Sequence, residues 1–465
     1  MIHISLCRLV LPGIFFIAAV GNTLAGDALT KTGKTPTSGP VAKADAAAVT
    51  EAKPNPLGAS PFAGGISGNP AASNIFTGTG EAQRFVQQQL GIKDDHGVRL
   101  GGLWAADTNW VLSGGDSQRN SFNSLVIVDL RIDLEKLTDG LLKGGSFGAS
   151  FLQFNGDFTN RDAGSVQGFN SLPGPTPLDR SELYQLWVRQ AFFDDKLAVR
   201  IGKVVPTYDF NNVMLPITLD DENSYIPSVS GLSMTPVFIN PTLIGALPGY
   251  YNSALGATIN ITPVKWWYMN LGVYDGSGAK GIQTGIEAPY FGGYYMGIAE
   301  TGFNWTLGEC KLPGRFAVGG WHQSGHLTGP PGVEEEGASG FYLFGNQRLW
   351  YANPGKDASG VTSFVQYGIN DSRTLPVNEY VGGGLTAFGL VPCRPADSFG
   401  IGAAWSRLNH HIFARESEFM IQGYYQAHVY GTVYFEPSLT YIPTPGINKE
   451  LDASWSTTLR LTVLF

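Results

Sequence analysis

Charged residues are scarce in this sequence, and long apolar runs are missing beyond its first 25 residues. Charged side chains make up 15% of the 465 residues, whereas about 25% is usual in soluble proteins. The surface of a soluble protein needs that charge to stay hydrated. A helical membrane protein would instead need apolar runs of about 20 residues. The composition therefore disfavours both an ordinary soluble protein and a helical membrane protein.

Basic clusters and catalytic signatures are also scarce. The net charge is −8 and no cluster of Lys or Arg exceeds two residues, so nucleic acid is not an expected partner. The zinc-protease signature HExxH is missing. His322 and His326 have the i,i+4 spacing of a helical metal site, but they lie where a β pattern meets a Gly/Pro-rich loop. The chain is therefore predicted not to be an enzyme and to need no metal or cofactor.

The N-terminal 96 residues divide into three predicted segments. Residues 1–25 have the short apolar stretch of a signal peptide, with a small-x-small cleavage site at residues 23–25. Residues 26–80 are rich in Pro, Ala, Gly and Thr, which predicts a disordered segment. Residues 81–96 are predicted to hold one short helix, Glu81–Ile92, in which the apolar residues share one face. The chain is thus expected to be exported.

From residue 97 to residue 465, apolar residues recur with a period of two, as in β-strands. In Leu125–Leu134, one face is wholly apolar and the other carries Asp129, Arg131 and Asp133. Glu182–Phe192 shows the same alternation, and Tyr184 is expected on its apolar face. The same alternation is seen in Leu197–Gly202, Phe316–Gln323, Ser363–Ile369, Phe419–Tyr430, Gly431–Tyr441 and Trp455–Phe465. Segments of about 10 residues match tilted membrane-spanning strands.

Three further features favour a transmembrane antiparallel β-barrel over a soluble β-sandwich. Charge is low, the chain ends in a strand with Phe465 as its last residue, and aromatic residues bracket the strands. Aromatic girdles mark both membrane interfaces of such barrels. The bracketing residues are Trp110, Trp187, Trp266, Trp267, Tyr268, Trp350, Tyr351, Tyr441 and Trp455. At about 10 residues per strand plus loops, residues 97–465 are sufficient for about 16 strands.

The polar face of the strands would line the barrel lumen. Trp187, Arg189 and Arg200 should point inward on two strands that are joined by a short turn at Asp194-Asp195. Asp129, Arg131 and Asp133 provide inward charges on an earlier strand. Charges of both signs order water, and an indole face can stack on a sugar ring. These six residues are the candidates for a substrate-binding constriction, and the alternative is a generic polar lumen.

At these same residues the sequence resembles a known family. Ser181–Phe210 reads SELYQLWVRQAFFDDKLAVRIGKVVPTYDF, and Leu134–Phe158, Leu271–Gly278 and Glu416–Gly446 follow the same family pattern in the expected order. Together they resemble the bacterial carbohydrate-selective porins of the OprB type. The long segment 26–80 departs from the family, as does Ser438 in the final motif, where the family commonly has Asp.

The resemblance implies an outer-membrane porin that passes glucose and related sugars by facilitated diffusion. Sugars and outer-membrane lipid are then the expected partners, and Phe465 resembles the signal read by the barrel-assembly machinery. The alternative is a secreted, soluble β-sandwich that binds polysaccharide. Two points stay open, namely whether Cys310 and Cys393 pair and whether the narrow point lies in an infolded loop such as Asn211–Pro248.

Overall fold

The computed structural model describes most of the chain after residue 96. The described residues are 97–170, 172, 179–213, 239–248, 252–276, 294–330, 332–354, 357, 359–431 and 433–465. The predicted signal peptide, disordered segment and N-terminal helix lie outside the described residues. In the part of the chain that is described, no helix is both long and apolar enough to cross a membrane.

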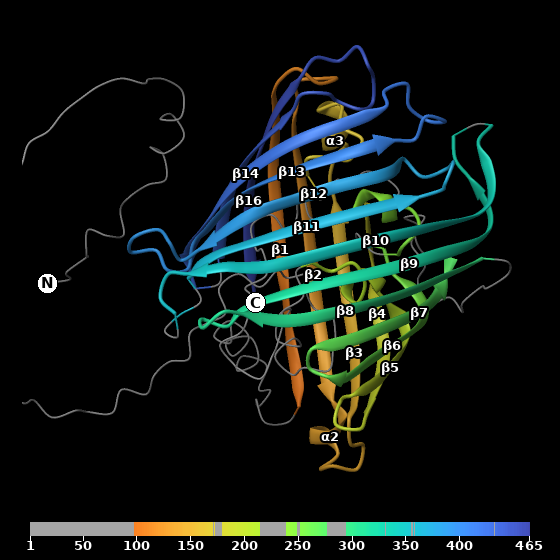
Figure 1. Cartoon of the computed structure of the whole chain (residues 1–465), viewed down its shortest axis with the longest axis vertical. Helices are drawn as coiled ribbons and strands as arrows, with labels where there is room; N and C mark the ends of the chain where they lie inside the picture. The colour runs from red at the N-terminus through yellow and green to blue at the C-terminus, as the bar shows by residue number, and fades with distance from the viewer. Residues whose placement is uncertain are drawn as a thin grey trace, which may run out of the picture. The chain divides into compact units, whose positions relative to one another are not determined.

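Sixteen antiparallel strands of the described chain form a closed barrel (Figure 1). They are β1 (Val98–Ser113), β2 (Asn120–Asp133), β3 (Gly145–Asn155), β4 (Arg180–Phe192), β5 (Leu197–Val204), β6 (Ala254–Val264), β7 (Trp267–Asp275), β8 (Tyr295–Leu307), β9 (Leu312–Thr328), β10 (Glu334–Tyr351), β11 (Gly360–Asn370), β12 (Val377–Phe388), β13 (Ser398–Leu408), β14 (Ser417–Tyr430), β15 (Val433–Ile442) and β16 (Ser454–Leu464). The short helices are α2 (Leu134–Leu137), α3 (Thr159–Asp162), η5 (Pro206–Tyr208) and η7 (Pro241–Leu243). The predicted fold class and strand number are confirmed.

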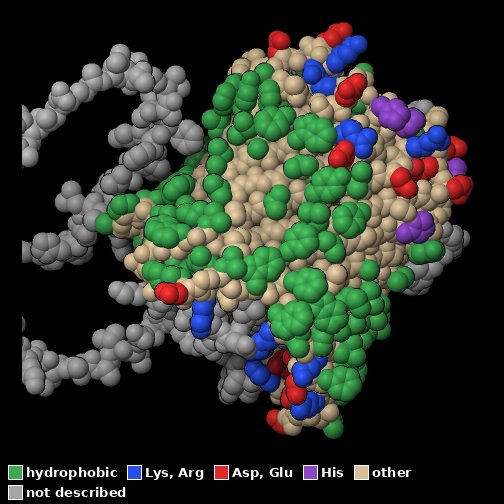
Figure 2. Space-filling view, viewed as in Figure 1, with side chains coloured by type: hydrophobic (Ala, Val, Ile, Leu, Met, Phe, Trp, Pro, Cys, Tyr) green, Lys and Arg blue, Asp and Glu red, His purple; other side chains and the backbone are tan. Residues whose placement is uncertain are grey.

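The two faces of the strands differ as the alternation predicts. Large apolar side chains are exposed on the outside, including Phe122, Val188, Ile201, Val365 and Ile401. Figure 2 shows hydrophobic side chains spread over the strands, while most charged side chains gather towards the two ends of the barrel. Because a lipid-facing wall must satisfy every backbone polar group, a closed sheet is one of the few structures that can form it.

The predicted outward position of Tyr184 is wrong. Leu183 pairs with Phe151 and Gln185 pairs with Ser150, so Tyr184 is an extra residue in β4. Such a β-bulge shifts the alternation by one residue. Tyr184 is therefore buried inside the barrel, in an apolar cluster with residues of β1, β2 and β3.

The aromatic residues form outer girdles only in part. The Tyr441 ring stacks on Trp455 at 4.5 Å between centroids, and the Trp266 ring stacks on Phe303 at 6.2 Å. The first pair lies beside the β15–β16 loop and the second beside the short β6–β7 turn, hence at opposite ends of the barrel. Two residues that were expected to bracket the strands, Tyr268 and Tyr351, are instead buried on the inward face, where Trp187 also lies, as its alternation predicts.

The barrel has one rim of mostly short turns and one rim from which the longest connections leave. Phe465 ends β16 at the short-turn rim, where its backbone N–H and C=O both bond to Gly102 of β1 at 3.0 and 2.7 Å. The Phe465 ring covers Gly102, where any side chain would collide with it. Cys310 and Cys393 lie exposed in two different turns of this rim and form no disulfide with each other. The question of their pairing is thereby answered.

Candidate functional site: the barrel lumen and its two infolded loops

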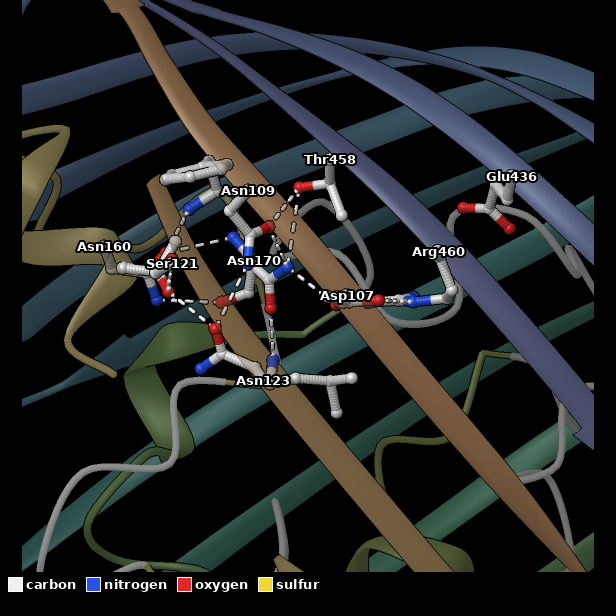
Figure 3. A network of polar contacts seen from close by, with 12 residues as sticks. Asp107, Asn109, Ser121, Asn123, Asn160, Asn170, Glu436, Thr458 and Arg460 are labelled. Atoms are coloured by element: carbon white, nitrogen blue, oxygen red, sulfur yellow. Dashed lines mark hydrogen bonds and ion pairs between the residues drawn. The ribbon is translucent and has the colours of Figure 1, made fainter. Parts of the chain in front are cut away.

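The β3–β4 loop folds against the inner wall of the barrel. The Asn170 amide donates hydrogen bonds to Asp107 and Asn109 of β1, both at 2.7 Å (Figure 3). Asp107 in turn accepts two hydrogen bonds from Arg460 of β16, at 2.7 and 2.6 Å. Thr458 donates to Asn109 at 2.6 Å. Asn170 of the loop is thus held on β1 by buried polar side chains, which are themselves bonded to β16.

The same loop continues along the wall to β13 and β14. Ser406 of β13 donates a hydrogen bond to the Gln167 side chain at 2.8 Å. Gln422 of β14 donates to the carbonyl oxygen of Phe169 at 3.0 Å. The described part of the loop therefore lines the arc of wall that runs from β1 through β16 to β13.

The β5–β6 loop lines the opposite arc. One inward side chain from each of three strands holds its first part: Asn270 of β7 donates to Asp209 O at 2.8 Å, Glu300 of β8 accepts from Asn211 N at 2.7 Å, and Asn346 of β10 donates to Val213 O at 2.6 Å. Farther along, Asn370 of β11 donates to Thr242 O at 2.9 Å. The described parts of segment 211–248 therefore lie inside the barrel, against β7 to β11.

The structure brings three of the predicted site residues together. Arg189 of β4 lies directly opposite Arg200 of β5 in the strand register, and the Arg200 guanidinium lies 5.8 Å from the centre of the Trp187 ring. Each arginine has a carboxylate partner that alternation alone did not identify. Arg200 pairs with Asp209 of the β5–β6 loop, and Arg189 pairs with Asp195 of the β4–β5 turn at 3.2 Å.

The Trp187 ring is covered in this structure. Its side chain lies over Gly148 of β3, where an added Cβ would overlap with the ring. With Arg200 close to the ring, Trp187 is only 4% exposed. Stacking on a sugar would therefore require Arg200 or other neighbouring side chains to move, and the role of Trp187 in sugar binding stays a prediction.

The other three predicted residues lie on β2 and have different polar partners, although Arg131 pairs in register with Gly148, over which the Trp187 ring lies. Asp129 pairs with Arg131 of the same strand at 2.8 Å and accepts a hydrogen bond from Ser150 at 2.6 Å. Asp133 caps helix α2 at the short-turn rim, where it accepts a hydrogen bond from the backbone of Lys136 at 3.2 Å. The charges on β2 thus do not pair with the arginines of β4 and β5.

Sequence reasoning did not select the residues that hold the loops. Asp107, Glu300 and Arg460 all have inward positions on strands, so their alternation was a usable signal. Asp209 lies in a loop and gave no such signal. The sequence thus indicated that the first three residues point inward from strands, but the loop segment that each one contacts depends on the tertiary fold.

The histidines and the serine motif of the described residues form neither a metal site nor a nucleophile turn. They contain no group of three His, Cys, Asp or Glu side chains placed to hold a metal ion. His322 contacts Ser339 at 2.9 Å and His326 contacts Glu336 at 2.8 Å. Gly144–Gly148 spells GxSxG, but Ser146 lies in β3 and not in the strand-to-helix turn that such a nucleophile needs.

Comparisons with known proteins agree with this architecture. Residues 126–465 match the family described as carbohydrate-selective porin, OprB family. Porin B of Pseudomonas aeruginosa is 23% identical over 403 residues, covering 76% of this chain and 84% of that protein.

Two solved structures of OprB from Pseudomonas putida share the fold. The high-pH structure has a TM-score of 0.67 at 17% identity and covers 83% of this chain and 98% of that one. The low-pH structure has a TM-score of 0.51 at 15% identity and covers 83% and 97%. The closed barrel rules out a soluble β-sandwich, and the match to the porin family and to Porin B places the barrel in the bacterial outer membrane. The chain belongs to the OprB family of carbohydrate-selective porins.

Proposed function

We propose that this porin passes glucose and related neutral sugars by facilitated diffusion, through the space between its two infolded loops. The observation that carries the proposal is the pairing of inward charges. Asp107 with Arg460, and Asp129 with Arg131, form buried pairs of opposite sign. Such a wall presents many hydrogen-bonding groups with little excess charge. A neutral polyol can exchange its water for these groups, whereas an ion gains little in return for its hydration shell.

Liposome swelling tests this proposal. Vesicles that contain the refolded porin are mixed with glucose, with a similarly sized amino acid or with a sugar phosphate. The expected order of swelling rates is glucose first and the phosphate ester last. Equal rates for all three solutes would show a pore that selects by size alone and would refute the proposal.

Trp187, Arg189 and Arg200 are proposed to form part of the constriction. Replacing Trp187 by Ala removes the ring that lies between Gly148 and Arg200, so the pore should conduct ions better and prefer sugar less. Trp405→Ala is the matched control, because Trp405 is an outward residue of β13. Unchanged glucose preference in the Trp187 variant would place the narrow point elsewhere.

We propose two further partners, namely outer-membrane lipid and the barrel-assembly machinery. The exposed apolar side chains of the outer wall fit an acyl-chain environment. Phe465 closes the barrel on β1, and we propose that it is also the residue by which the assembly machinery recognises the last strand.

A further inference from the structure

Glu418 lies near the start of β14, and its side chain is fully buried inside the barrel. Its carboxylate accepts four hydrogen bonds: from Ser165 Oγ at 2.6 Å, Val166 N at 2.8 Å, Gln167 N at 3.2 Å and Gly446 N at 2.7 Å. Three of these donors belong to the β3–β4 loop and the fourth to the β15–β16 loop. One wall residue thus contacts two loops that are far apart in the sequence.

A buried carboxylate needs compensation for the water it loses. Within the described residues, no Lys or Arg forms a salt bridge with Glu418, so hydrogen bonds from the loops provide that compensation. An ionised carboxylate has about four acceptor sites, and four loop donors point at this one. Hydrogen bonds to an ionised group are stronger than those between neutral groups. The position of the β3–β4 loop and the burial of Glu418 therefore depend on each other.

The approach of the loops is close. An added Cβ at Gly446 would lie 2.6 Å from a Glu418 oxygen, so a larger residue there would force the carboxylate to shift. Among the other contacts of the β3–β4 loop, those of Gln167 and Phe169 with β13 and β14 join neutral groups. Glu418 is thus a charged anchor on β14 for residues 165–167 of the loop, and Asn170 is held separately on β1.

We propose that Glu418 is a positioning residue that latches the β3–β4 loop against the inner wall and thereby sets the width of the sugar path. The sugar-selectivity part of this proposal rests on the proposed function, whereas the latch itself is a statement about the loop. Loss of the carboxylate should release residues 165–167 towards the lumen or the rim, while the barrel stays closed, because no strand pairing passes through Glu418's side chain.

The variant that tests the latch is Glu418→Gln, which keeps the shape of the side chain. A glutamine amide offers one acceptor oxygen and an NH₂ donor, so at least one loop N–H or hydroxyl would face a donor. Glu436→Gln is the matched control, because Glu436 is also a buried, inward carboxylate, on the neighbouring strand β15. The hydrogen bond that Glu436 accepts comes from Gln426 of β14 at 3.2 Å and not from a loop.

Two measurements on refolded porin in lipid vesicles and bilayers decide the question. Arg161 lies in α3 of the same loop, so trypsin cleavage after Arg161 reports release of the loop. Single-channel conductance and glucose preference report the width of the path. In Glu418→Gln we expect faster cleavage, a conductance that at least doubles and loss of glucose preference. The Glu436→Gln control should resemble the unmodified porin.

Equal cleavage rates and conductance in Glu418→Gln and the unmodified porin would overturn the proposal, as would equal changes in the Glu436→Gln control. If Glu418→Gln fails to fold, Glu418→Asp serves instead, because it keeps the charge but shortens its reach and should give intermediate values. If the unmodified porin shows no glucose preference, the proposed function fails. Cleavage and conductance of the variant still test the latch in that case.

Discussion

Replacing Val365 by Arg should destabilise the folded porin strongly, because Val365 faces lipid at mid-strand. It is the middle residue of β11 and its side chain is 49% exposed. Its neighbours across the two strand pairs are Gly345 and Gly383. An arginine at this position would therefore have no side chain directly opposite it on either neighbouring strand.

The expected cost follows from the depth of the site. An arginine on the lipid face near the bilayer midplane costs about 2–4 kcal/mol, and the cost falls towards the interfaces. At about 1.4 kcal/mol per factor of ten, the folded-to-unfolded ratio should fall roughly 30- to 700-fold. Gln426→Arg is the matched inward control. Gln426 lies 3.2 Å from Glu436, so an arginine there gains a carboxylate partner in a polar lumen.

Denaturant unfolding in phospholipid vesicles, followed by tryptophan fluorescence, gives the free energy of unfolding of each variant and of the unmodified porin. We expect Val365→Arg to lose stability in the stated range, and Val365→Leu and Gln426→Arg to stay close to the unmodified porin. Equal losses in Val365→Arg and Gln426→Arg would refute the assignment of the outer and inner faces.

Three further predictions follow from the rim, the turns and the buried pair. Deleting Phe465 removes both backbone bonds to β1 and should leave little folded barrel, as seen by the gel shift on heating; normal amounts of folded protein would contradict this. A bulky, membrane-impermeant thiol reagent should label Cys310 and Cys393 in intact cells only after the outer membrane is opened, because short turns face the periplasm, and labelling of unopened cells would reverse the orientation. Arg200→Met leaves the Asp209 carboxylate buried without its cation, which should cost about 3–5 kcal/mol, and Asp209→Leu in the same chain should restore most of the unfolding free energy.

The strands were predictable because lipid on one side and a polar lumen on the other impose a period of two. Segments such as 125–134 and 455–465 show that period clearly, and the structure has strands over 120–133 and 454–464. The position of Tyr184 was not predictable, since a β-bulge adds one residue without a marked change in composition. The inward position of Tyr268 was equally hidden, because three consecutive aromatic residues, 266–268, do not show by themselves which of them faces the lumen.

The candidate site was predictable only in its strand residues. The short turn after β4 predicted that Arg189 and Arg200 point inward from neighbouring strands, and in the structure the two residues lie opposite each other. Their partners were not predictable, because Asp209 lies outside the alternating strands, just after helix η5, and Glu418 binds a loop that begins over 250 residues earlier in the chain. Contacts of this kind are set by the closed barrel, which brings opposite ends of the sequence together at β1 and β16.

Single-channel recording in planar bilayers tests the central claim, a sugar-selective path through the lumen, most directly. The purified, refolded chain is recorded in salt solution while glucose is added, and then while a similarly sized charged amino acid is added. We predict stable ion-conducting steps that glucose reduces reversibly in a concentration-dependent way and that the amino acid leaves nearly unchanged. A chain that forms no channel, or a channel whose conductance responds equally to both solutes, would contradict the account.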